Sequence, residues 1–174
     1  VGNIDANHPY KDFNSLNESL KIIQILRRKK NVKFLKKINY KFKLGKIYSL
    51  MGPSGSGKST LLNIISLIDR PSTGIIKFQN NVINFNKNWE NDIFRAKNIG
   101  IIYQQDNLLS DFTALENVYL ACMSAGYDKE FAVNKAKKFL SNVGLSSRLN
   151  HYPNELSGGE KQRVSISRAL INEP

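Results

Sequence analysis

The stretch GPSGSGKS, residues 52–59, constrains the fold of this chain more than any other part of it. It fits the pattern G-x-x-x-x-G-K-[ST] and lies between a strand-like run, IYSLM, and an apolar run at residues 61–68 that suits a helix. Glycines let the backbone wrap closely around a phosphate, and the helix that follows adds the positive end of its dipole. The sequence therefore predicts a nucleoside triphosphate site in this loop.

Two residues of the loop have specific predicted roles. Lys58 is expected to reach the β- and γ-phosphates, and Ser59 is expected to place its hydroxyl on Mg²⁺. A Gly/Ser-rich turn that only caps a helix is the alternative, and the strand, the spacing and Lys-Ser-Thr together disfavour it. Phosphate loops serve kinases, GTPases, helicases and transporters, so the motif does not name a reaction. The remaining predicted nucleotide-binding residues are Gly52, Pro53, Ser54, Gly55, Ser56, Gly57 and Thr60.

A second motif, LSGGE, begins a helix-like stretch at residues 156–160. Ser157 and Glu160 form a capping box, which by itself predicts a well-capped structural helix. Gly158 and Gly159 would each lower helix propensity in the first turn by about 1 kcal/mol relative to alanine. They make sense if a ligand must approach the backbone, because a helix N-terminus is an anion site. The chain therefore carries two half-sites for one triphosphate.

The chain resembles the ATP-binding subunits of ABC transporters over about residues 32–174. The resemblance rests on GPSGSGKST, IIYQQDNLL and LSGGEKQRVSISRAL in this order. Within that superfamily, LLSDFTALENV and VGLSSRLNHYPNELSGGEKQRV are similar to the lipoprotein-releasing and macrolide-export types. The resemblance implies an α/β P-loop NTPase fold, an ABC-type nucleotide-binding domain with a β-rich N-terminal part. It places this domain at residues 31–174, a helical subdomain at about 104–156, and a segment without an assigned role at 1–30.

The same resemblance implies a site shared between two copies that pair head to tail and bind ATP and Mg²⁺. It makes Lys58 and Gln104 catalytic residues, with Gln104 contacting Mg²⁺ or water and sensing transmembrane subunits that dock on the helical subdomain. Gln105 is a weaker candidate for that role, and His151 is expected to lie outside the active site. The residues that would close on the γ-phosphate held by the other copy are Leu156, Ser157, Gly158, Gly159 and Glu160.

The resemblance also implies that the family continues beyond Pro174 into an apolar strand ending in Asp-Glu, which supplies a Mg²⁺ ligand and the glutamate that polarises water. We therefore expect the domain to be truncated before this Walker B strand, and the 174 residues alone to be inactive, whereas the full-length protein is an ATPase. In the corresponding stretch, QILRRKKNVKF at residues 24–34, no aromatic residue precedes Phe34 to stack on adenine. Phe34 is expected in the core, and Arg27 or Arg28 is an alternative stacking residue.

The leading hypothesis is the ATPase subunit of a lipoprotein-releasing transporter, peripheral on the cytoplasmic side of the inner membrane. Another ABC system, for macrolide or peptide export, import or non-transport cell-division and cell-wall control, is the alternative. A DNA-repair ATPase is disfavoured because no sustained heptads separate Lys58 from Ser157. The net charge of +12 comes mostly from lysines scattered among asparagines, with one dense basic run at residues 27–37. Solvated charged faces are the leading interpretation, and acidic lipid headgroups or another polyanion are the alternative. Charge alone does not decide the function, and no nucleic-acid partner is expected.

Local patterns predict the remaining elements. Leu16, Leu20, Ile23 and Leu26 recur at helical spacing, and residues 128–144 also follow this spacing.

The single cysteine, Cys122, lies in an apolar run and is expected to be a buried, inert side chain. The longest apolar stretch, residues 61–68, is too short for a bilayer, which takes about 20 residues. Strands are predicted at residues 32–42, 46–51, 74–78, 82–85 and 98–104.

Overall fold

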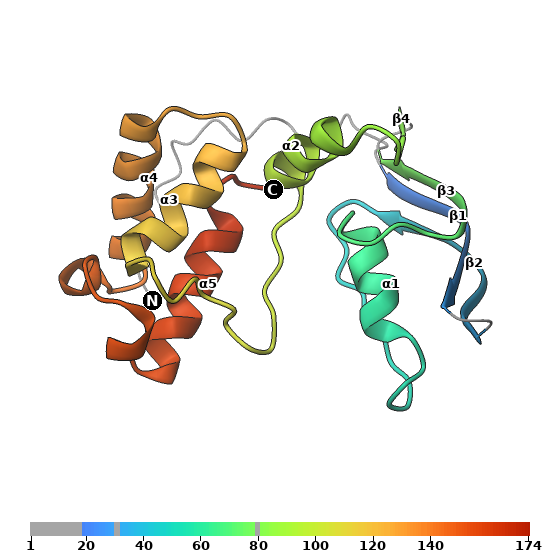
Figure 1. The fold of residues 1–174 in the computed structure, drawn as a ribbon, viewed down its shortest axis with the longest axis horizontal. Helices are drawn as coiled ribbons and strands as arrows, with labels where there is room; N and C mark the ends of the chain where they lie inside the picture. The colour runs from blue at the N-terminus through green and yellow to red at the C-terminus, as the bar shows by residue number, and fades with distance from the viewer. Residues whose placement is uncertain (1–18, 30–31, 79–80) are drawn as a thin grey trace. The chain divides into compact units, whose positions relative to one another are not determined.

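The computed structural model describes residues 19–29, 32–78 and 81–174, which form two compact units (Figure 1). Unit 1 comprises Val1–Leu61 and Pro71–Ile83, and unit 2 comprises Leu62–Arg70 and Asn84–Pro174. Unit 1 is rich in strands and unit 2 in helices, so the α/β class with a β-rich N-terminal part is confirmed. The two units are described separately below.

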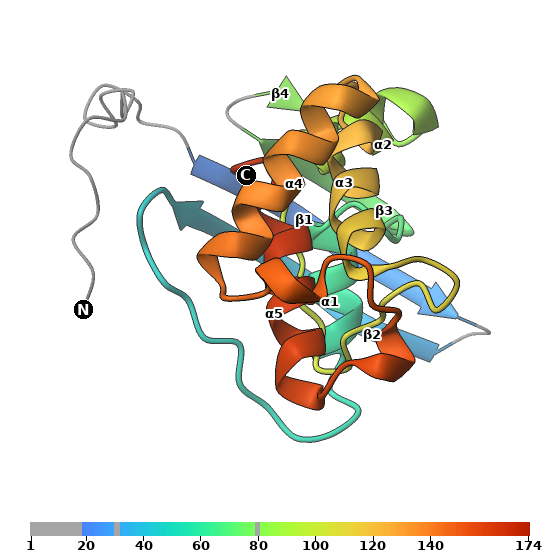
Figure 2. The ribbon, with the colours of Figure 1, turned by 90° about the vertical axis from the view of Figure 1, so that its left-hand side faces the viewer.

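Unit 1 is organised around a four-stranded antiparallel sheet with the strand order β2-β1-β3-β4. β1 pairs with β2 along its length and with β3 on its other edge, so β1 and β2 lie side by side in both ribbon views (Figures 1 and 2). The strands are β1 (Ser19–Lys29), β2 (Val32–Lys43), β3 (Thr73–Phe78) and β4 (Asn81–Val82).

The helix prediction from the spacing of Leu20, Ile23 and Leu26 is wrong, because these residues lie in strand β1. The segment is rich in isoleucine, a β-branched residue that favours strands. Its central place in the sheet also gives the backbone hydrogen-bonding partners on both edges. Leu16, the first residue of the proposed pattern, lies outside the described residues.

The strand predictions have mixed outcomes. Residues 32–42 lie in β2 and 74–78 in β3, whereas only Val82 of residues 82–85 lies in β4. Residues 46–51 and 98–104 are not strands. A buried strand needs neighbours for its N–H and C=O groups, and among the described residues these two segments have none. Ile47 and Met51 are consequently exposed despite their apolar side chains.

Unit 2 consists of helices, with a long irregular segment at residues 99–113 between α2 and α3. Its three longer, core-forming helices after residue 110 begin with side-chain caps, from Thr113, Asp128 and Ser157, which accept from backbone N–H groups of the first turn. The helix predicted within residues 128–144 is confirmed as α4. The helical elements are α2 (Asn88–Asn98), α3 (Ala114–Ser124), α4 (Lys129–Asn142), η2 (Ser146–Arg148), η3 (Pro153–Glu155) and α5 (Gly158–Leu170).

The helix predicted near residues 61–68 is α1 (Lys58–Ile65), which begins directly in the glycine-rich loop. Its first residues belong to unit 1 and its last to unit 2. In the part of the chain that the structure describes, no helix is long and apolar enough to cross a membrane.

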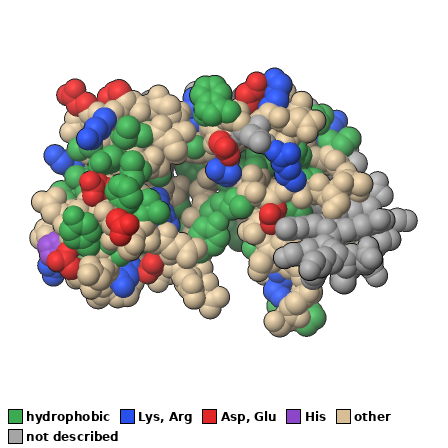
Figure 3. All heavy atoms as spheres, viewed as in Figure 1, with side chains coloured by type: hydrophobic (Ala, Val, Ile, Leu, Met, Phe, Trp, Pro, Cys, Tyr) green, Lys and Arg blue, Asp and Glu red, His purple; other side chains and the backbone are tan. Residues whose placement is uncertain are grey.

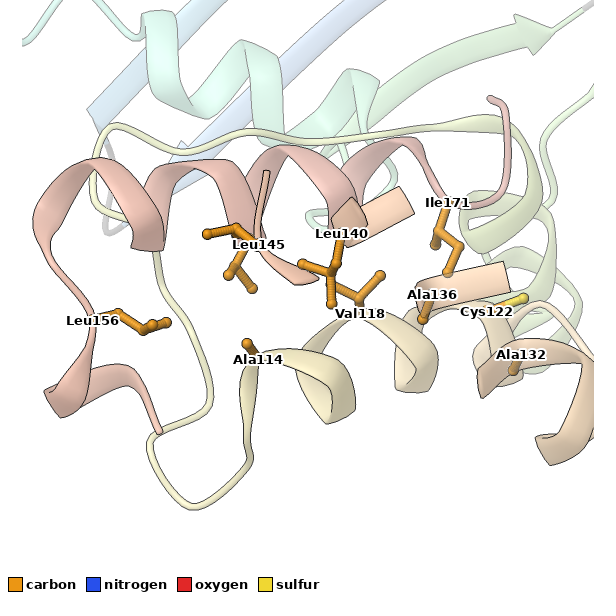
Figure 4. Close-up of a cluster of buried hydrophobic side chains, with 10 residues drawn as sticks. Ala114, Val118, Cys122, Ala132, Ala136, Leu140, Leu145, Leu156 and Ile171 are labelled. Atoms are coloured by element: carbon orange, nitrogen blue, oxygen red, sulfur yellow. The ribbon is translucent and has the colours of Figure 1, made fainter. Parts of the chain in front are cut away.

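The apolar core of unit 2 joins α3, α4 and α5 (Figure 4). Val118, Ala136, Leu140 and Val164 are fully buried there, and α3 and α4 run side by side in both ribbon views. Cys122 is also fully buried, and burial raises the pKa of its thiol, so the prediction of a buried cysteine is confirmed.

Asn117 is a polar residue in this otherwise apolar helix face. Its side-chain oxygen accepts from the backbone N–H of Leu109 at 2.8 Å, and its amide nitrogen donates to the carbonyls of Leu109, Phe112 and Thr113 at 2.9–3.1 Å. Because the side chain is almost fully buried, these bonds replace water for it. Asn117 thereby fastens the chain before α3 to the helix.

Asn117→Leu should lower the free energy of unfolding by about 2–3 kcal/mol, because it leaves buried backbone groups without partners. Chemical denaturation measures this loss. Asn134→Leu, at an exposed position of α4, is the matched control and should change stability by about 0.5 kcal/mol or less. Equal losses in both variants would contradict the assigned role of Asn117.

Candidate functional site

The glycine-rich loop of unit 1 leads directly into the first turn of α1. Gly55 and Gly57 have φ angles of 78° and 91°, which residues with a Cβ rarely adopt. The loop closes on itself through a bond from the Ser56 N–H to the Pro53 carbonyl at 3.3 Å. The N–H groups at the start of α1 have no intrahelical acceptors, because the first turn of any helix lacks them. This is the backbone arrangement that binds a phosphate.

The ammonium group of Lys58 lies against its own loop. It donates to the carbonyls of Gly52 and Pro53, both at 2.7 Å, and lies 3.5 Å from the Ser56 hydroxyl. The cation is therefore held beside the loop by neutral acceptors and not by an acidic partner. A phosphate that enters the loop has to replace one of these acceptors as the hydrogen-bonding partner of Lys58. It does not have to displace a carboxylate from the ammonium group.

Ser59 follows Lys58 at an exposed position of α1. Its hydroxyl group is predicted to contact Mg²⁺. Within the described ranges, no group of three His, Cys, Asp or Glu side chains could hold a metal ion. Mg²⁺ is commonly bound by few protein oxygens together with substrate phosphates and water. A single serine hydroxyl beside a phosphate loop fits that kind of site.

The LSGGE motif lies in unit 2, where it forms the start of α5. Ser157 is the N-cap residue, and its side-chain oxygen accepts from the N–H of Glu160 at 3.3 Å. The carboxylate of Glu160 accepts in return from the N–H of Ser157 at 2.8 Å. The predicted capping box is confirmed. Leu156, directly before the cap, is buried in the core and anchors the start of the helix.

The two glycines of the motif are open to their surroundings. A Cβ added to Gly158 would meet no atom within 4 Å, and one added to Gly159 would meet only the end of Arg163, at 3.7 Å. Neither glycine has a positive φ angle. Packing and backbone conformation within the described chain therefore do not require glycine here, which favours the approach of an external ligand.

Glu160 carries a strongly stabilised charge at this helix start. The hydrogen bonds from the backbone and side chain of Ser157, followed by that from Arg148, lower its pKa to about 2. Arg148 Nε donates to Glu160 Oε1 at 3.0 Å, across a separation of 12 residues. The carboxylate is thus ionised at neutral pH and is paired with a guanidinium.

Gln104 and Gln105 lie on exposed, irregular chain in unit 2. The chain that follows them is fastened to α5, because Arg168 donates to the carbonyls of Asp106 and Asn107 at 2.8 Å each. The structure does not bring the phosphate loop, Gln104 and the LSGGE motif into one described site. The catalytic role of Gln104 therefore stays a prediction.

Arg148, Arg168 and Asn117 were not found by the sequence analysis. Arg148 and Arg168 act on partners 12 to 62 residues away, and no local pattern encodes such pairs. Asn117 had a signal, since it is a polar residue on the same helical face as Ala114 and Val118. The side chains of Arg27, Arg28 and Phe34, proposed for adenine stacking or the core, lie outside what the structure describes.

The fold and the phosphate loop define a nucleotide-binding domain of the P-loop class. The family model described as ABC transporter matches residues 35–174, and this chain belongs to that family. An uncharacterized ABC transporter ATP-binding protein of Methanocaldococcus jannaschii is 49% identical over 140 residues, covering 80% of this chain and 62% of the relative.

Lipoprotein-releasing system ATP-binding proteins LolD are also similar to this chain. That of Cytophaga hutchinsonii is 43% identical over 159 residues, covering 91% of this chain and 73% of the relative. That of Bacteroides thetaiotaomicron is 45% identical over 144 residues, covering 83% and 66%. The chain thus spans about two thirds of the length of these relatives.

Two solved structures of the ABC transporter cassette MJ0796 match the fold. A dimeric structure has a TM-score of 0.79 and 39% identity, covering 89% of this chain and 70% of that one. A dimeric post-hydrolysis state bound to ADP and Pi has a TM-score of 0.76 and 37% identity over the same shares. These similarities confirm the predicted family and fold class.

The low pKa of Glu160 makes the stability of the domain depend on pH. Ionisation favours the folded state fully above the unfolded value of 4.5, and this contribution is lost as the pH falls towards the folded value of about 2. Denaturation at about pH 6 and about pH 3 should therefore give a stability difference between the parent and Glu160→Gln that shrinks at the lower pH. A difference that stays constant would contradict the cap geometry.

Proposed function

We propose that the protein containing this chain is the ATP-binding and ATP-hydrolysing subunit of an ABC transporter, and that its cargo is lipoprotein released from the inner membrane. The observation that carries the proposal is the presence of two anion-binding helix starts, one after a phosphate loop and one with two unobstructed glycines. The similarity to proteins named as lipoprotein-releasing ATP-binding subunits supports the cargo.

In this proposal the phosphate loop holds the β- and γ-phosphates through its backbone N–H groups, and Lys58 moves from its loop carbonyls onto them. The hydroxyl of Ser59, with Gln104, holds Mg²⁺, which would neutralise the charge that develops on the phosphate oxygens. Positioning and charge neutralisation account for most of the catalysis of such a transfer.

The second half of the site comes from a second copy of the chain. Leu156 holds the start of α5 in the core, while Ser157, Gly158 and Gly159 face the γ-phosphate bound to the other copy. Both cassette structures of MJ0796 are dimeric, which supports this arrangement. A head-to-tail pair also explains why one chain carries two half-sites in separate units.

The partners are transmembrane subunits that dock on the helical subdomain, at about residues 104–156, and the location is peripheral on the cytoplasmic side of the inner membrane. Similarity to LolD supports both proposals. Among the described residues on the face in Figure 3, basic side chains are interspersed with acidic and hydrophobic ones.

The proposal predicts ATP hydrolysis that depends on Lys58. A longer chain, extended by the roughly 60 residues expected to supply the Mg²⁺ aspartate and the water-activating glutamate, should hydrolyse ATP, and Lys58→Ala should reduce the rate by about 10²-fold or more. The 174-residue chain should be inactive. Steady-state phosphate release measures all three, and equal activity of the short and long chains would place the catalytic base within these 174 residues.

Gly158→Ala should separate folding from function. The substitution should leave stability unchanged or raise it by up to about 1 kcal/mol, because alanine favours the helix and meets no obstacle. The ATPase rate of the longer chain should nevertheless fall by about tenfold or more, because the methyl group lies where the phosphate approaches. Asn134→Ala, which raises helix propensity on exposed α4, is the control and should keep full activity.

A further inference from the structure

We propose that Arg148 is a positioning residue for the LSGGE helix start, and that it acts by neutralising and orienting Glu160. The proposal rests on the function proposed above, because it concerns how α5 meets the γ-phosphate held by a second copy. Arg148 itself does not contact the nucleotide in this proposal. It orients Glu160 at the start of α5, and the start of α5 contacts the nucleotide.

The two oxygens of the Glu160 carboxylate have separate partners. Oε2 accepts from the backbone N–H of Ser157 at 2.8 Å, and Oε1 accepts from Arg148 Nε at 3.0 Å. The Ser157 hydroxyl oxygen accepts in return from the Glu160 N–H at 3.3 Å. Glu160 thereby holds the cap in this geometry.

The charge of Glu160 opposes the function of the helix start. A carboxylate in the first turn stabilises the helix, but it repels a phosphate that approaches the same end. Its pKa of about 2 keeps it ionised at every physiological pH, so protonation does not remove the repulsion. The guanidinium of Arg148 does remove it, because the pair carries no net charge. Arg148 thus leaves the helix dipole and the free N–H groups to attract the anion.

Arg148 is itself held in place by the core and by His151. Its backbone N–H donates to the carbonyl of Leu145, a fully buried residue, at 3.0 Å. Its guanidinium lies 3.2 Å from His151 Nε2, and because arginine only donates, this nitrogen is the acceptor wherever the two form a hydrogen bond. The carbonyl of His151 in turn accepts from the N–H of Ala114 at the start of α3. The ion pair therefore joins the starts of α3 and α5.

Lys87 and Glu90 provide a matched comparison elsewhere in unit 2. They also pair a cation with a glutamate in the first turn of a helix, α2, at 2.8 Å. Both side chains are more than half exposed, whereas that of Glu160 is only 18% exposed. Lys87→Ala therefore removes an ion pair of the same kind, although a more exposed one, and leaves the LSGGE helix unchanged.

The test is a double-mutant cycle in the longer, ATP-hydrolysing chain, with Arg148→Ala, Glu160→Gln and the double variant. Arg148→Ala should lower kcat by about tenfold and change ATP affinity for the phosphate loop by less than about twofold. In the Glu160→Gln background, the same substitution should cost less than about twofold, because the opposing charge is gone. Arg148→Lys should recover part of kcat, and Lys87→Ala should keep it.

A second readout does not depend on catalysis. NMR titration of the Glu160 carboxyl in the 174-residue chain should show its pKa rising from about 2 towards 4.5 in Arg148→Ala, with helix content retained. Equal kcat losses in both backgrounds, or an unchanged Glu160 titration, would overturn the role of Arg148. If the parent shows no ATPase activity that depends on Lys58, the proposed function fails instead, and the titration alone then decides about Arg148.

Discussion

The apolar core of unit 2 holds α5 at both of its ends, and the second half-site depends on this constraint. Leu156 is buried directly before the N-cap, Val164 in the middle of the helix and Ile171 directly after it. Because these three residues share one core with α3 and α4, the helix start cannot turn inward without opening that core. The unobstructed backbone at Gly158 and Gly159 is thus presented outward by packing.

The two half-sites manage their positive charge in different ways. In unit 1, Lys58 rests on neutral carbonyls of its own loop, so its full charge is available once the hydrogen bonds exchange. In unit 2, the guanidinium of Arg148 is paired with Glu160. The helix dipole and the backbone N–H groups at the start of α5 are then the groups that attract an anion. In the function proposed above, a strong cation on one side and a neutral, oriented cap on the other would let the two halves attract the same phosphate without repelling each other.

Local chemistry explains which features could be predicted from the sequence. The helix that starts in the glycine-rich loop and the Ser157–Glu160 capping box are encoded within a few residues, and both were predicted correctly. β1 was taken for a helix because Leu20, Ile23 and Leu26 recur every three residues, and the pairing with β2 and β3 overrides that local pattern. The strands expected at residues 46–51 and 98–104 failed for the same reason, since a strand exists only with a neighbour. The pairing of Arg148 with Glu160 likewise depends on packing between distant segments.

Helix α5 makes contacts at both of its ends, and these contacts concern two different parts of the proposed site. Ser157 caps α5, and Arg168, about 16 Å along the axis at 1.5 Å per residue, grips the carbonyls of Asp106 and Asn107 just beyond Gln104. Asn107 has a φ angle of 46°, an uncommon conformation for a residue with a side chain. A helix of this length behaves as a stiff rod. In the function proposed above, a tilt imposed at its capped end would reach the turn after Gln104 as a displacement, and α5 would act as a lever between the bound phosphate and that turn.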